Sequence, residues 1–317
     1  MIRSFASSQW FRKKSIAAAV LLLASPLVRA QAVSVTGGST VTVDGIVSTT
    51  SNFVSGYGLF VTNGGTATGS ADISTAGSNA QAVYVSYGGN VKLSDSSVAT
   101  TGSQSPAIHA LFGNAMAALD NTAVTTSGDW SHGIEASDNS TIMLQDGSVT
   151  TSGQNAYGLY AIGTGSNLTA TGTTVSTSGN DSIGAYNQGG GLITLDDVSI
   201  VTAGSNARGV QIGAQGVVGN GTTENVIQIS NSTVTTTGDN STGLLASDNA
   251  TLNAANVGVL TSGASNFGAA ALFGAQMQLK GGSVRRPAMM HGGSWSPACR
   301  RRPATSARPR RPLPRRA

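Results

Sequence analysis

Residues 122–153 read TAVTTSGDWSHGIEASDNSTIMLQDGSVTTSG, and this stretch holds one complete unit of a repeat and the start of the next. Val124, Thr126 and Gly128 stand in the order V-x-T-x-G, and the same order returns 25 residues later from Val149 onward. Outward from here a β-branched residue recurs in steps of 25 or 26, with one longer step of 34. The recurring residues are Val47, Ile73, Val98, Val124, Val149, Val175, Ile200, Val234, Val259 and Val284. Such a fixed period indicates a solenoid.

Three further columns share this period. Threonine stands two residues after each of the first nine β-branched positions: Thr49, Thr75, Thr100, Thr126, Thr151, Thr177, Thr202, Thr236 and Thr261. Glycine stands four residues after eight of them: Gly77, Gly102, Gly128, Gly153, Gly179, Gly204, Gly238 and Gly263. We expect these glycines to end a strand through a positive φ. A turn column follows, which we assign to Asn79, Gln104, Trp130, Asn155, Asp181, Asn206, Asn240 and Asn266, because Asn and Asp tolerate left-handed backbone.

Each unit contains three short strands with alternating side chains. V-x-T forms one strand, Gly133–Ala136 represents a second of the form G-h-x-h, and Thr141–Leu144 represents the third. Three strands in about 25 residues predict an all-β, right-handed parallel β-helix over residues 33–284. The β-branched residues then fill the core, and we expect the threonines to form a hydroxyl ladder beside them. The long step predicts extra residues at 213–225. Disorder is the alternative that the low charge allows.

The two ends differ from the repeats. Arg3, Arg12 and the two lysines after it precede the apolar run Ile16–Ala24, and Ala30 and Ala32 give a small-x-small cleavage pattern, so residues 1–32 are predicted to be a secretory signal peptide. Between Ala32 and Val284 there are 3 basic and 14 acidic residues, a net charge of −11 that disfavours a nucleic-acid partner. The single cysteine, Cys299, lies outside the repeats, so no disulfide is expected in them.

Residues 285–317 form a basic tail rich in Arg and Pro. An interaction tail is the ordinary interpretation. Read one base earlier, however, the codons permit glycine at positions 288 and 293 and require aspartate at 290 and alanine at 291, which are the residue types that the repeat predicts there. We therefore expect that a frameshift near codon 285 has converted a longer repeat protein into a truncated, disordered-tailed product.

Signal sequence, cysteine-free repeats and the S-x-V-x-T-x-G … G-h-x-h coil resemble pertactin-like autotransporter passenger domains of Gram-negative type V secretion, over residues 33–284. The resemblance implies an exported, adhesin-like, virulence-associated passenger fragment whose partner is a host-surface glycan or protein. It implies a cell-surface or outer-membrane location for the intact parent, and a periplasmic or extracellular one for this chain. It also implies a β-barrel translocator in the parent, but no barrel-like strands follow Val284. A complete small secreted solenoid that binds glycan or protein is an alternative.

Parallel β-helices also occur in polysaccharide-degrading enzymes, which need clustered carboxylates or a metal. Here the acids are scattered, Asp196 and Asp197 face opposite ways, and His109 and His132 occupy different coil positions. We therefore predict no enzyme activity and no catalytic, cofactor or metal site. Ice binding is a third alternative, which the inward threonine column disfavours.

The middle residues of the G-h-x-h strands should point outward and form one column: Phe60, Tyr84, His109, Glu135, Tyr160, Tyr186, Gln211 and Leu245. Phe60, Tyr84, Tyr160 and Tyr186 make a candidate surface-binding stripe, because rings offer apolar area to a glycan or a protein. The alternative, which we favour, is that these rings stack on one another and stabilise the solenoid.

Overall fold

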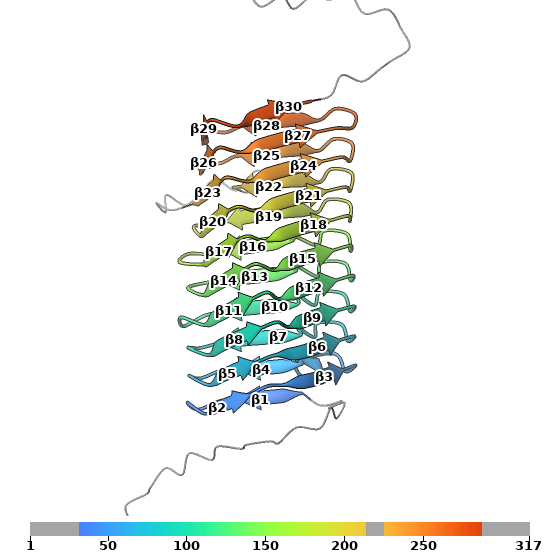
Figure 1. The fold of residues 1–317 in the computed structure, drawn as a ribbon, viewed down its shortest axis with the longest axis vertical. Helices are drawn as coiled ribbons and strands as arrows, with labels where there is room; N and C mark the ends of the chain where they lie inside the picture. Colours follow the sequence, from blue (N-terminus) through green and yellow to red (C-terminus); the bar gives the residue numbers. More distant parts are fainter. Residues whose placement is uncertain (1–31, 214–224, 287–317) are drawn as a thin grey trace, which may run out of the picture. The chain divides into compact units, whose positions relative to one another are not determined.

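In the computed structural model, which describes residues 32–213 and 225–286, the chain forms a right-handed parallel β-helix of ten coils. Each coil gives one strand to each of three ten-stranded parallel sheets (Figure 1). The fold predicted from the 25-residue period is confirmed. The predicted signal peptide, the tail from residue 287 and the insertion at 214–224 lie outside the described residues.

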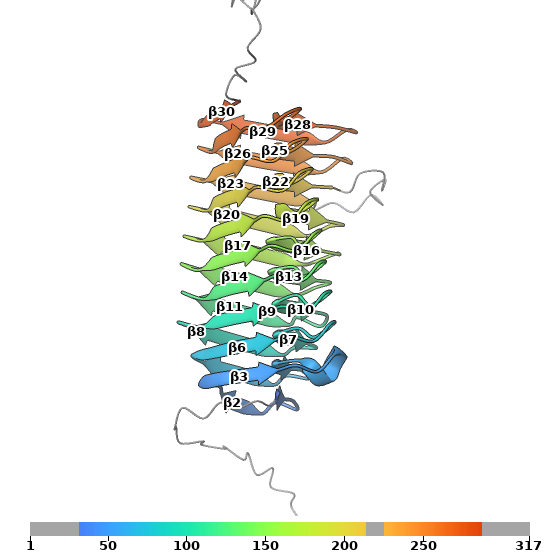
Figure 2. The same cartoon turned by 90° about the vertical axis from the view of Figure 1, so that its right-hand side faces the viewer.

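The three sheets run side by side along the whole stack (Figure 2). The first sheet contains β1 (Val33–Val35), β4 (Leu59–Val61), β7 (Val83–Ser86), β10 (Ile108–Leu111), β13 (Ile134–Ser137), β16 (Leu159–Ile162), β19 (Ile183–Gln188), β22 (Arg208–Ile212), β25 (Thr242–Ala246) and β28 (Phe267–Ala271). The second contains β2 (Thr40–Thr42), β5 (Thr66–Gly69), β8 (Asn90–Ser94), β11 (Met116–Asp120), β14 (Thr141–Gln145), β17 (Asn167–Thr171), β20 (Leu192–Asp196), β23 (Val226–Ser230), β26 (Thr251–Ala255) and β29 (Gln276–Lys280). The third contains β3 (Gly45–Thr49), β6 (Ala71–Thr75), β9 (Ser97–Thr100), β12 (Ala123–Thr126), β15 (Ser148–Thr151), β18 (Thr174–Thr177), β21 (Ser199–Thr202), β24 (Thr233–Thr236), β27 (Gly258–Thr261) and β30 (Ser283–Arg285). A 3-10 turn, η1 (Phe53–Gly56), precedes β4.

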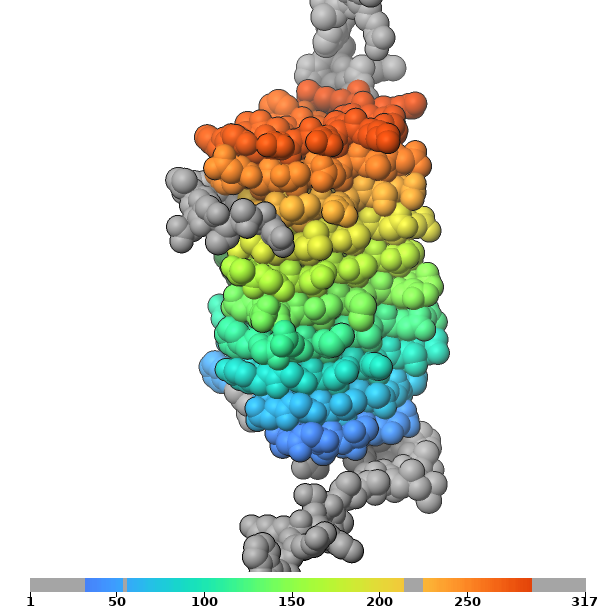
Figure 3. Space-filling view, turned by 90° about the vertical axis from the view of Figure 1, so that its left-hand side faces the viewer, coloured from blue at the N-terminus to red at the C-terminus, as the bar shows by residue number. Residues whose placement is uncertain are grey.

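The pairing register places like residues on like residues. Val124 pairs with Val98 on one side and with Val149 on the other, which confirms the predicted β-branched column. Its members from Val47 to Val259 are buried in one continuous apolar core. Figure 3 shows the coils as successive bands along the stack. The long sequence step does not interrupt it, because β20 pairs with β23 and β22 with β25 across the insertion.

The threonine column points inward as predicted, but it forms no hydroxyl ladder. In the first five coils each hydroxyl donates to a main-chain carbonyl of its own coil, as Thr126 Oγ1 does to Ser131 O at 2.7 Å. In the later coils the hydroxyls are buried and have no hydrogen-bond partner: Thr177, Thr202, Thr236 and Thr261. The ladder prediction is wrong, because the early hydroxyls bond to carbonyls of their own coil and the later hydroxyls make no hydrogen bond.

The glycine column does not end the strands through a positive φ, contrary to the prediction. Of its eight members only Gly263 has a positive φ. The others are needed because the stacked backbones approach closely: a Cβ on Gly153 would lie 1.9 Å from the carbonyl oxygen of Gly128 on the preceding coil. No side chain fits at that distance, so the period of the glycines reflects inter-coil packing rather than strand termination.

The turn column is left-handed as predicted, with φ between 54° and 57° from Asn79 to Asn240. In the ninth coil the assignment to Asn266 is wrong, because the left-handed residue there is Ser265. Asn266 is instead buried, where its side chain donates to Gly238 O at 2.8 Å and accepts from Ser241 N at 2.8 Å.

The two ends of the described stack differ in burial. Of the inward residues of the first coil, Val35, Val43 and Val47 are buried, and Val33 and Val41 are partly buried. In the last coil the inward residues Leu279 and Val284 are 48% and 46% exposed. The core is therefore open to solvent at the β28–β30 end.

Candidate binding face

Aromatic residues are confined to one side of the solenoid. Every aromatic residue in the described part of the chain lies on the outward face of the first sheet or in a turn next to it. The twelve are Phe53, Tyr57, Phe60, Tyr84, Tyr87, Phe112, Trp130, Tyr157, Tyr160, Tyr186, Phe267 and Phe273. We call this side the aromatic face. The second and third sheets present mainly Ser, Thr, Asn and Ala outward, so the three sides are chemically distinct.

Strand alternation and register produce the column that the sequence predicted. Leu59 and Val61 point into the core, so Phe60 between them points outward. Phe60 pairs with Tyr84 on the next coil, and Tyr160 pairs with Tyr186 in the same column. Rings on neighbouring coils are thereby brought to stacking distance.

Three rings stack at the first coils of this face. Phe60 and Tyr84 lie 5.3 Å apart between ring centroids with planes at 12°, and Tyr57 lies 4.9 Å from Tyr84 at 20°. His109 makes a T-shaped contact with Tyr84, at 5.7 Å between ring centroids and 85° between planes. Neighbouring rings therefore cover part of the ring faces of this group.

A second group occupies the middle coils. His132 stacks on Tyr157 with centroids 4.5 Å apart, and Tyr160 stacks on Tyr186 at 5.3 Å. Tyr160 donates its hydroxyl to Gln188 Oε1 at 2.7 Å. Burial raises the pKa of both Tyr160 and Tyr186 well above the ordinary value, so both phenols are neutral.

The candidate stripe is therefore exposed only in part. Phe60 and Tyr84 are half-buried, whereas the expectation of outward exposure is wrong for Tyr160 and Tyr186, whose side chains are buried. The rings stack on one another, as the favoured alternative predicted. Whether the stripe also binds a partner stays a prediction. Of the predicted cleavage residues, only Ala32 lies within the described range, and it is exposed.

His109, Glu135 and Ser137 meet on this face. His109 Nε2 lies 3.6 Å from Glu135 Oε1 and 3.3 Å from Ser137 Oγ, and Ser137 Oγ lies 3.3 Å from Glu135 Oε1. A Ser-His-acid relay needs the hydroxyl and the carboxylate on opposite ring nitrogens. Here both contact the same nitrogen, and the buried Nδ1 has no partner, so this group does not have relay geometry.

The remaining titratable groups have structural contacts. The two histidines contact different neighbours, as their coil positions predicted. Asp196 accepts from Ser230 Oγ at 2.7 Å and Asn231 Nδ2 at 2.9 Å, and these bonds lower the pKa of its carboxyl group. Within the described ranges no three His, Cys, Asp or Glu side chains are grouped to hold a metal ion. In residues 32–213 and 225–286 there is also no helix of the length and apolarity that a membrane span requires.

The sequence predicted the turn position of Trp130, but it gave no role to this ring or to the other aromatic residues of the turns. Phe53, Tyr87, Phe112, Trp130 and Phe273 have φ between 45° and 57° and are 63%, 56%, 40%, 53% and 68% exposed. Elsewhere the same turn positions hold mostly Asn, Asp or Gly, as Asn155 does in the column of Trp130. An aromatic residue in an Asn/Gly column is the signal that could have revealed them.

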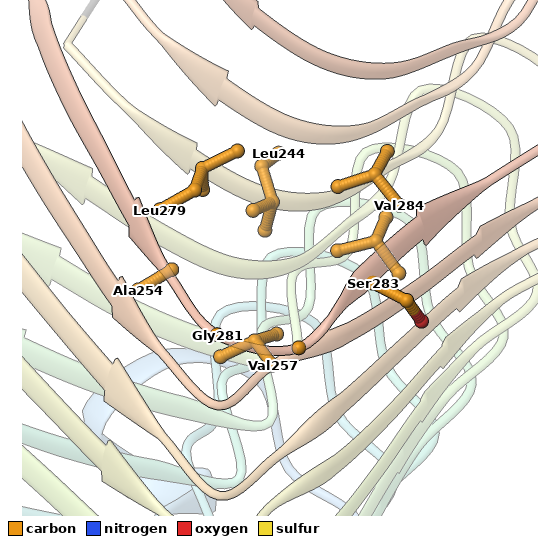
Figure 4. A pocket seen from close by; sticks show the side chains of 9 residues that line it. Leu244, Ala254, Val257, Leu279, Gly281, Ser283 and Val284 are labelled. Atoms are coloured by element: carbon orange, nitrogen blue, oxygen red, sulfur yellow. The ribbon is translucent and has the colours of Figure 1, made fainter.

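A hollow opens at the end of the stack, lined by Leu244, Val259, Leu279, Val284 and neighbouring glycines (Figure 4). Its walls are the inward side chains of the last two coils. It is the open end of the core, and it is separate from the aromatic face.

Comparison with known proteins supports the fold. The chain is similar to the Vag8 chain in the cryo-EM structure of the Vag8-C1 inhibitor complex, with a TM-score of 0.62 and 19% identity over 81% of this chain and 71% of that chain. At this identity the likeness shows the β-solenoid fold alone. No family model matches the sequence, and no curated protein matches it.

Proposed function

We propose that the chain is an exported, adhesin-like autotransporter passenger fragment that binds a host-surface molecule through its aromatic face. It works as a binding protein and not as an enzyme. The intact parent belongs at the cell surface, and this chain belongs in the periplasm or outside the cell.

The observation that carries the proposal is the confinement of all twelve described aromatic residues to one of three sides. Ring stacking alone does not require this, because rings could stack equally well on the other two sheets. Exposed apolar side chains gathered on one side are typical of interaction surfaces. The likeness to Vag8, which is in complex with C1 inhibitor in the solved structure, supports a solenoid of this kind as a binding protein.

The signal-like residues 1–32 support export. Truncation by a frameshift is supported by the exposed inward residues Leu279 and Val284, which a further coil would cover. Sequencing of the gene beyond codon 285 tests that part: a shifted frame that continues the 25-residue coils supports it, and the lack of any such frame contradicts it.

Binding is tested with the purified full chain, fluorescently labelled, on cultured mammalian cells. We expect saturable binding that falls about tenfold or more in the double variant Phe60→Ser/Tyr84→Ser. The matched control is Val201→Ser/Leu260→Ser, which removes two exposed apolar side chains from the outward face of the third sheet. Equal binding by both double variants would contradict the proposal.

A further inference from the structure

We propose that Phe53, Tyr87, Phe112 and Trp130 are contact residues of the aromatic face beside Phe60 and Tyr84, and that the partner they bind is a protein with a basic surface. This inference rests on the proposed function and names the class of partner and the residues that select it. The four side chains stand in the turns on the two sides of the first sheet, Phe53 and Trp130 before its strands and Tyr87 and Phe112 after them.

The backbone conformation of these residues is unfavourable for their type. All four lie in the left-handed region, where Cβ crowds the carbonyl oxygen and where Gly, Asn and Asp are favoured. Asn155, Asn206 and Asn240 fill the same column as Trp130, so the fold does not need a tryptophan there. A residue with a strained backbone, at a position where another residue type would be less strained, points to a role other than folding.

Their exposure agrees with that interpretation. Each of the four is 40% exposed or more, so none contributes chiefly to the core. Tyr87 and Phe112 lie side by side, with ring centroids 5.8 Å apart and planes tilted at 33°. Together they present apolar area on a turn whose backbone is fixed by hydrogen bonds to the next coil, such as Tyr87 N to Phe112 O at 3.1 Å. Because this surface is already rigid, little conformational entropy is lost when a partner binds to it.

The stacked rings offer little to a glycan. Sugars pack their C–H faces on aromatic ring faces, and Phe60 and Tyr84 each have a face covered by the other, with Tyr57 stacked beside them. Ring edges and the tilted Tyr87–Phe112 pair instead suit the irregular apolar side chains of a protein surface.

Charge indicates which protein surface fits. Asp129 adjoins Trp130 in the sequence, Asp138 occupies the turn column of Phe112, and Glu135 lies on the sheet between the two turns. From Val33 to Ala207 the only basic residue is Lys92, which lies on β8 of the second sheet. Acidic side chains therefore lie near Trp130 and Phe112, and they complement a partner that carries Arg or Lys beside apolar groups.

The contact role is tested with Trp130→Asn and with Tyr87→Asn/Phe112→Asn in the full chain. Trp130→Asn relieves the strain and removes no ring contact, so we expect Tm to rise by about 1–3 °C while binding to mammalian cells falls about tenfold. Gln104→Asn is the matched control, because Gln104 has the same left-handed conformation one coil earlier. It should raise Tm similarly and leave binding unchanged. Unchanged binding in Trp130→Asn, at whatever Tm, would overturn the proposal.

The partner class is tested by pretreating the cells. We expect trypsin to abolish binding of the wild-type chain, and sialidase and peptide N-glycosidase to leave it intact. We also expect 0.5 M salt to weaken binding, because the Debye length is then only about 4 Å. Binding that survives trypsin and disappears after glycosidase treatment would overturn this inference and leave the proposed function standing. Absence of wild-type binding to untreated cells would overturn both.

Discussion

The backbone N–H of Tyr157 donates a hydrogen bond to Nδ1 of His132, 3.0 Å away on the preceding coil. The two rings also stack, and His132 is buried. Because Nδ1 accepts a hydrogen bond, the ring is neutral and carries its proton on Nε2. Protonation of His132 would therefore break an inter-coil contact inside the aromatic face.

This relationship predicts an acid-sensitive stability. Burial lowers the pKa of His132, with Glu135 opposing the shift and His109 adding to it. The unfolded chain, with an ordinary histidine pKa of about 6.5, then binds the proton more readily than the folded chain. The free energy of unfolding should fall as pH drops below about 6.5 towards the lower folded-state pKa.

Urea unfolding at pH 7.5 and at pH 5.5 measures the effect, with His132→Gln as the comparison, because Gln81 fills the same column two coils earlier. The wild-type midpoint should be lower at pH 5.5, and the variant should lose most of that difference. An identical pH dependence in both proteins would show that His132 does not cause it.

Two equivalent threonines should respond in opposite ways to removal of the hydroxyl. Thr126 Oγ1 donates to Ser131 O, whereas Thr202 Oγ1 is buried without a partner. Thr126→Val should lower the free energy of unfolding by about 1–2 kcal/mol, because it leaves the carbonyl unpaired. Thr202→Val should be neutral or stabilising, since it removes an unsatisfied buried group. Denaturant titration decides; equal losses in the two variants would count against the hydrogen-bond assignment.

The glycine column predicts sensitivity to a single methyl group. A Cβ at residue 153 would lie 1.9 Å from Gly128 O, so Gly153→Ala forces two coils apart and should cost about 1–3 kcal/mol or more. Gly258→Ala is a suitable control, because the nearest atom to its Cβ would be 3.8 Å away. If thermal unfolding shows the two variants to be equally stable, the close approach is not the reason for the column.

The inward and outward positions of one strand should tolerate charge very differently. Val149 is fully buried and Thr150, its neighbour on β15, is exposed. Val149→Asp places an unpaired charge in the core and should cost about 3–5 kcal/mol. Thr150→Asp should change stability by no more than about 0.5 kcal/mol. Circular dichroism during urea unfolding provides the comparison, and a tolerated Val149→Asp would contradict the register.

Period and side-chain type were enough to predict the coils, because a fixed repeat leaves one register in which Val98, Val124 and Val149 stack. The purpose of Gly153 could not be read from the sequence, because it depends on the distance between backbones of two coils. The burial of Tyr160 and Tyr186 depends equally on neighbouring side chains such as Gln188 and Tyr157. The turn position of Trp130 followed from the period, whereas the exposure of its ring depends on how the neighbouring coils pack.

Hydroxyl-radical footprinting of the full chain, free and bound to mammalian cell membranes, tests most directly whether the aromatic face is the binding surface. Oxidation of Tyr84, Tyr87, Phe112 and Trp130 should fall on binding. Met116 and Met143, which are exposed on the second sheet, should be oxidised equally in both states. Protection of the two methionines with unchanged oxidation of the aromatic residues would show that the solenoid binds through another side.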